Sequence, residues 1–134
     1  MAPIKSIEGI GPKYEAKLKE LGIKNVENLL EIAANKKGRE KLSEDTGISE
    51  KMILTWVNHA DLFRIKGIGT QYSELLEAAG VDSVPELANR KPENLLIKMT
   101  EVNEEKKLVR GLPLLKQVQK WVAQAKELPK VVSH

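Results

Sequence analysis

The chain contains the stretch Gly9-Ile10-Gly11-Pro12-Lys13 and repeats its pattern as Gly67-Ile68-Gly69-Thr70-Gln71. Each copy precedes a segment whose apolar residues recur at helical spacing. At the same offset of 58 residues the match continues in the pairs Ile7 and Ile65, Tyr14 and Tyr72, Leu18 and Leu76, Gly22 and Gly80, Val26 and Val84, and Leu29 and Leu87. Because the match includes the apolar face and the stop signal of the following segment, we interpret it as the duplication of a whole structural unit.

Helix start and stop signals follow each copy. Pro12 suits the first position of a helix, and Gly22 suits the left-handed residue after its end, which predicts a helix over residues 12–21. The corresponding segment of the second copy is expected to end at Gly80. We predict that Asn25 caps the next helix, and that its counterpart Ser83 forms a capping box with Glu86.

A longer helix is expected to close each copy, over residues 49–64 in the first and 113–128 in the second. These helices carry Trp56 and Trp121, whose apolar neighbours at helical spacing predict core positions. The second copy has extra residues around Arg110-Gly111-Leu112-Pro113, which we interpret as a longer connection or an added turn. We also expect Ile10 and Ile68 in the core, and Tyr14 and Tyr72 in the core or at its rim.

These patterns together predict an all-α fold, because no segment shows clean period-two alternation. We expect two units, over residues 1–62 and 63–134, packed as one globular body. A hinge between two lobes near residues 62–64 is the alternative.

Composition excludes several classes of protein. The 134 residues are 41% hydrophobic and 31% charged, which is typical of a globular chain. No cysteine is present, which excludes disulfides, thiolate catalysis and thiolate-bound zinc. No run approaches the roughly 20 apolar residues of a membrane span, and the N-terminus lacks the apolar core of a signal peptide. We therefore expect a cytoplasmic protein without a membrane partner.

The repeated glycine turn favours phosphate as a ligand. A tight turn that leads into a helix exposes backbone N–H groups and the positive end of the helix dipole, and both attract anions. The formal net charge of +3 permits a nucleic-acid partner without requiring one. An aromatic content of 4% disfavours a binder that stacks on single-stranded bases, so contact with the backbone of a duplex fits better.

Two segments resemble the helix-hairpin-helix motif. We call Ile7-Glu8-Gly9-Ile10-Gly11 the first hairpin and Ile65-Lys66-Gly67-Ile68-Gly69 the second hairpin. In DNA-repair and recombination proteins this motif joins two helices and binds the DNA backbone. The chain from residue 4 to residue 128 also resembles a family of short tandem helix-hairpin-helix proteins of unknown function. The resemblance implies two tandem units with short additional helices, a SAM-like architecture.

The same resemblance implies which residues contact phosphate. In the first copy these are Gly9, Gly11 and Lys13, with Lys17 as a further basic candidate. In the second copy they are Gly67, Gly69 and Thr70, with Lys66. Because Gln71 replaces Lys13 and acidic residues follow it, we expect DNA contact mainly at the first hairpin.

The densest basic segment, around Lys36, Lys37 and Arg39, is a candidate for a second backbone contact. The same residues would also suit a solvated helix end, since cations are stabilising near a helix C-terminus.

Three functions remain open at this point. The first is a non-sequence-specific protein that binds double-stranded DNA, and the second is a protein-interaction or oligomerisation module whose hairpins are only structural. The third is a lyase that forms a Schiff base between a lysine and an abasic sugar, but no single lysine stands out for it. We otherwise expect no enzyme, no cofactor and no metal, because His59 and His134 have no second histidine at helical spacing.

Overall fold

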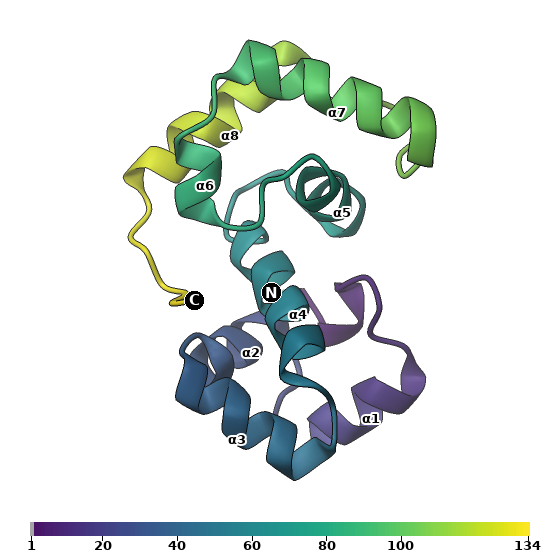
Figure 1. Cartoon of the computed structure of the whole chain (residues 1–134), viewed down its shortest axis with the longest axis vertical. Coiled ribbons are helices and arrows are strands. Elements are labelled where there is room, and N and C mark those ends of the chain that lie inside the picture. The colour runs from purple at the N-terminus through teal and green to yellow at the C-terminus, as the bar shows by residue number, and fades with distance from the viewer. Residues whose placement is uncertain (1) are drawn as a thin grey trace. The chain divides into compact units, whose positions relative to one another are not determined.

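The computed structural model of the chain describes residues 2–134, and its regular elements are helices (Figure 1). The predicted all-α class is confirmed. In chain order the elements are the 3-10 helix η1 (Ile4–Ser6) and the α-helices α1 (Pro12–Glu20), α2 (Val26–Ala33), α3 (Lys36–Thr46), α4 (Glu50–Leu62), α5 (Thr70–Ala78), α6 (Val84–Ala88), α7 (Pro92–Lys106) and α8 (Leu115–Glu127).

The helices follow the duplication. The first hairpin is followed by α1 to α4, and the second hairpin by α5 to α8. Helices α1 and α5 each have 9 residues, and the closing helices α4 and α8 each have 13. The first hairpin follows only the short η1, whereas the second follows shortly after α4.

The chain divides into two compact units. The first unit comprises the residues up to Asp61 together with Val131–His134, and the second unit is Leu62–Lys130. We expected the last four residues in the second unit, but they group with the first. Two contacts hold these residues in the first unit. Val132 is buried, and the Ser133 N–H donates a hydrogen bond to the Ala34 carbonyl (2.9 Å).

Local signals set the helix ends where the sequence predicts them. Pro12 is the first residue of α1, and Gly22 follows its end with a left-handed φ of +83°. The Asn25 side chain caps α2 by accepting a hydrogen bond from the Asn28 N–H (2.8 Å).

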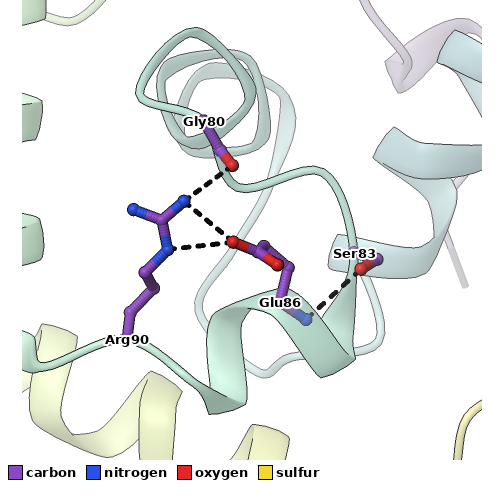
Figure 2. A network of polar contacts seen from close by, with 4 residues as sticks. All are labelled: Gly80, Ser83, Glu86 and Arg90. Carbon is purple, nitrogen blue, oxygen red and sulfur yellow. Dashed lines mark hydrogen bonds and ion pairs between the residues drawn. The ribbon is translucent and has the colours of Figure 1, made fainter.

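The predicted capping box of α6 forms only in part (Figure 2). The Ser83 hydroxyl accepts a hydrogen bond from the Glu86 N–H (3.3 Å). The Glu86 carboxylate instead accepts from Arg90, whose Nη2 lies 2.8 Å from it and also donates to the Gly80 carbonyl (3.0 Å). Figure 2 shows that Arg90 thereby fastens the turn between α5 and α6 to the end of α6.

Each unit has its own apolar core, to which its hairpin contributes an isoleucine. Ile10 and Ile68 are both 5% exposed, which confirms the expected inward orientation. The tryptophans of the closing helices are also buried, as predicted. In the second unit the core extends over α5 to α8 and includes Leu75, Leu76, Val84, Leu87, Leu95, Met99, Val118 and Val122.

The extra residues of the second copy form a longer connection, one of the two predicted outcomes. It runs from the end of α7 to Leu114, and the side chain of Asn103 braces it. Asn103 Oδ1 accepts from the Val109 N–H (2.9 Å), and its Nδ2 donates to the Val109 carbonyl (3.1 Å). Across residues 2–134 none of the helices has the length and apolar character that a bilayer crossing requires.

Candidate nucleic-acid interface

The two hairpins have the same backbone geometry. Gly9 and Gly67 adopt φ angles of +95° and +98°, a region that favours glycine over residues with a β-carbon. In each hairpin the N–H of the inner isoleucine donates a hydrogen bond three residues back, from Ile10 to Ile7 (3.2 Å) and from Ile68 to Ile65 (3.1 Å). The turn is thus closed by its own backbone.

Each hairpin leads into a helix that has no capping side chain at its N-terminus. Gly11 and Gly69 are the N-cap residues of α1 and α5, and neither helix start receives a hydrogen bond from a capping side chain. The first N–H groups of a helix have no intrahelical acceptor. A β-carbon at either glycine would meet no atom within 4 Å, so these helix starts are open to an approaching group. An anion is the natural acceptor for such donors.

The side chains predicted around the first hairpin differ in availability. Lys13, in the first turn of α1, is exposed to solvent. Lys17 is partly buried, and its ammonium donates to the Thr46 carbonyl at the end of α3 (3.3 Å). The Lys13 side chain is therefore available to contact a ligand, whereas Lys17 also joins α1 to the end of α3.

The second hairpin is fastened to α8. The Lys66 N–H donates to Gln124 Oε1 (3.0 Å), and Gln124 Nε2 donates to the Lys66 carbonyl (3.3 Å). The Lys66 side chain remains exposed. Thr70 begins α5 and accepts a hydrogen bond from the Ser73 hydroxyl at its carbonyl (3.0 Å). The Gln124 side-chain amide thus binds both the N–H and the carbonyl of Lys66.

The basic segment of α3 is not a helix C-terminus. Lys36 and Lys37 are exposed residues in the first turn of α3, after the N-cap Asn35. Positive side chains there lie at the positive end of the helix dipole, so dipole stabilisation does not explain them. Helix α3 packs on α2, whereas Gly9 of the first hairpin packs against Trp56 of α4.

The prediction that Arg39 contacts DNA needs correction. Arg39 is only 4% exposed, and its guanidinium donates to the carbonyls of Ala33 (3.0 Å), Ala34 (2.9 Å) and Ser133 (2.6 Å). Burial lowers the pKa of Arg39, and the charge of Glu50 opposes this shift. Its donors are used within the first unit, so we remove it from the candidate interface.

The sequence prediction missed a basic residue beside the first hairpin. A shallow groove there is lined by Glu8 and Gly9 from the hairpin and by Lys51, Thr55 and Trp56, among others, from α4. Lys51 lies one helical turn before Thr55, so the two side chains are on the same side of the closing helix. The position of this side relative to the hairpin becomes known only in the folded structure.

Metal ligands do not gather in the described part of the chain. Among residues 2–134 no three His, Asp or Glu side chains are placed to hold a metal ion. His134 Nε2 lies 3.1 Å from Asn58 Oδ1, and His59 is buried.

Comparison with known proteins identifies a family without an assigned activity. The model of the family described as "Domain of unknown function (DUF4332)" matches residues 8–128. No curated protein matches the chain, and no solved structure matches it.

Proposed function

The chain belongs to this family of unknown function, and we propose from its geometry that it binds the backbone phosphates of double-stranded DNA without reading base sequence. The observation that carries the proposal is the pair of uncapped glycine helix starts at Gly11 and Gly69. Other helices are capped by side chains, α2 by Asn25, α3 by Asn35 and α6 by Ser83, whereas α7 also begins without such a cap. Both helices that follow a hairpin begin at a glycine without a capping side chain, and this agrees with the resemblance to helix-hairpin-helix motifs.

Backbone contact also agrees with the positions of the aromatic rings. Trp56 and Trp121 are each 2% exposed, and each pairs with a tyrosine of its own unit, with ring centroids 5.3 Å and 5.1 Å apart. Proteins that bind single strands present exposed rings on which bases stack. The paired rings of this protein favour a duplex contacted through N–H groups and lysines, which carry no sequence information.

A protein-interaction module is the second candidate, and a specific observation favours it. Ile97 and Leu114 in the second unit are 58% and 70% exposed. A shallow apolar depression between α7 and α8 is lined by Leu96, Ile97 and Leu115, with Glu93 and Glu101 at its edge. Exposed apolar side chains that gather in this way are typical of docking surfaces.

Salt-dependent DNA binding tests the proposal. The fluorescence anisotropy of a labelled duplex, titrated with the protein, is expected to show micromolar affinity at about 50 mM salt. For roughly four phosphate contacts the affinity should fall about a hundredfold by about 200 mM salt, because binding releases counterions. Two duplexes of unrelated sequence should bind equally. No binding at the lower salt would reject DNA binding and favour the interaction module.

The substitution Lys13→Glu tests the first hairpin within this proposal. Reversing the charge beside the open N-terminus of α1 should weaken binding to every duplex by about tenfold or more, since a phosphate contact is replaced by repulsion. The far-ultraviolet circular dichroism should not change, because Lys13 is exposed. Equal affinity of the variant and the wild type would remove the first hairpin from the binding surface.

A further inference from the structure

Helices α4 and α8 have the same relation to their hairpins. Trp56 and Trp121 are equivalent at an offset of 65 residues, and each packs at a tilt against the tyrosine of its own unit. Each tryptophan also lies against a hairpin glycine. A β-carbon at Gly9 would be 3.4 Å from Trp56 Nε1, and one at Gly67 would be 3.0 Å from Trp121 Nε1. The surroundings of the two hairpins can therefore be compared position by position.

In the first unit, one row of α4 borders the hairpin. Lys51 and Thr55 lie one helical turn apart, and both line the groove beside Gly9. Glu8 lines the same groove from the hairpin. The negative charge of Glu8 offsets the positive charge of Lys51, so this face has little net charge.

The equivalent row of α8 is more basic. At the offset of 65 residues Lys116 corresponds to Lys51 and Lys120 to Thr55. One further turn along the row, Gln124 holds the backbone of Lys66 through two hydrogen bonds. At the offset of 58 residues Lys66 itself replaces Glu8. By these correspondences Lys66, Lys116 and Lys120 flank the second hairpin, whereas the first hairpin is flanked by the two lysines Lys13 and Lys51 and by Glu8.

We call Lys66, Lys116 and Lys120 the lysine face. All three side chains are exposed, and within residues 2–134 their ammonium groups form no salt bridge. The acidic residues Glu74 and Glu77 belong to later turns of α5, beyond the helix start at Gly69. Three like charges at the edge of an uncapped helix start create a positive local field that an anionic polymer would neutralise.

We propose that the second hairpin is the stronger phosphate-binding face of this protein, and that Lys116 and Lys120 extend it along the nucleic-acid backbone. This inference rests on the proposed DNA binding and specifies where it occurs. It reverses the expectation from the sequence, which favoured the first hairpin because Gln71 replaces Lys13. That expectation rested on the residues close to each glycine turn in sequence. It did not include the lysines of α8, because they lie about 50 residues after the second hairpin in the chain.

Two matched double variants test this inference in the full chain. Lys116→Gln with Lys120→Gln removes two charges beside the second hairpin, and Lys13→Gln with Lys51→Gln removes two beside the first. Lys98→Gln with Lys106→Gln on α7 is the control for net charge. Each is titrated against one labelled duplex at several salt concentrations. We expect the α8 pair to lower affinity about tenfold or more, and to reduce the slope of log affinity against log salt by about 2.

The outcomes separate the inference from the function on which it rests. A larger loss of DNA affinity in the Lys116 and Lys120 variant than in each of the other two double variants supports the inference. An equal or larger loss for the Lys13 and Lys51 pair would overturn it while leaving DNA binding intact, and so would an equal loss for the α7 control. If the wild type itself binds no duplex at low salt, the proposed function fails and the inference fails with it. Unchanged circular dichroism checks the fold of each variant.

Discussion

At the scale of single residues, arginine and lysine in the basic segments have different roles. Arg39 and Arg90 direct their guanidinium groups to backbone carbonyls and so fasten turns within their units. Lys36 and Lys37 remain exposed at the start of α3. The planar guanidinium of arginine has five donors and can bind several carbonyls at once. The lysine ammonium is a strongly hydrated charge on a flexible side chain, so it stays in solvent more readily. Arg39 and Arg90 therefore stabilise the fold, whereas Lys36 and Lys37 are available for binding.

Gly38 is predicted to be indispensable although it lies inside a helix. An alanine β-carbon there would stand 1.9 Å from the Ile32 carbonyl oxygen, because α2 and α3 approach each other closely at this point. Alanine normally stabilises a helix over glycine by about 1 kcal/mol. At this position we expect Gly38→Ala to lower the free energy of unfolding by about 2–3 kcal/mol through overpacking. Urea denaturation followed by circular dichroism measures the effect.

Gly111→Ala is the matched control for this measurement. A β-carbon at Gly111 would meet no atom within 4 Å. Its effect on the free energy of unfolding should stay within about 0.5 kcal/mol. A Gly38→Ala variant as stable as the wild type would show that α2 and α3 can separate without cost.

At the scale of elements, each closing helix supports a hairpin through one tryptophan. Trp56 and Trp121 lie between the hairpin glycine and the tyrosine that follows it. The Tyr72 hydroxyl also donates to the Gly111 carbonyl in the connection before α8 (3.3 Å). The hairpin, the next helix and the closing helix are thereby held together, which orients the uncapped helix start.

Removing either tryptophan should therefore destabilise its unit. We expect Trp56→Ala and Trp121→Ala each to lower the free energy of unfolding by about 3–5 kcal/mol, because a large side chain with 2% exposure is lost from a packed core. Thermal and urea unfolding measure this loss. Leu114→Ala, at a position that is 70% exposed, is the control and should change stability little. A loss below about 1 kcal/mol for a tryptophan variant would contradict its place in the core.

At the scale of the whole molecule, the first unit includes residues from both ends of the chain. Val132 is 3% exposed in this unit, and the Ser133 carbonyl accepts a hydrogen bond from Arg39. The fold of the first unit is therefore complete only with residues that follow the second unit in sequence.

The substitution Val132→Asp should weaken the first unit selectively. Burying a carboxylate without a partner is expected to lower its stability by about 2–4 kcal/mol. Hydrogen exchange followed by mass spectrometry should show faster exchange in α2 and α3 and unchanged exchange in α6 and α7. Equally faster hydrogen exchange in both units would contradict a role of Val132 confined to the first unit. Val131→Asp is the control, because Val131 is 42% exposed.

Much of the fold could be predicted from the sequence, because the signals involved are local. Proline at a helix start, glycine with positive φ at a helix end and an asparagine cap each act on residues within one or two turns. Apolar residues at helical spacing place both tryptophans in a core, and the apolar residue between the two glycines of each hairpin places Ile10 and Ile68 there. The internal repeat made these signals stronger, since each appears twice.

By itself, then, the sequence determined the helices, their duplication and the two glycine hairpins, all of which depend on neighbouring residues. Only the tertiary structure decided which charges surround the hairpins and which are buried. Arg39 donates to a carbonyl 94 residues away, and Gln124 holds a hairpin 58 residues away. Such contacts form between side chains that the folded chain brings together, and their partners have no signature in local sequence. The role of Arg39 and the support of the second hairpin by Gln124 follow from that three-dimensional proximity.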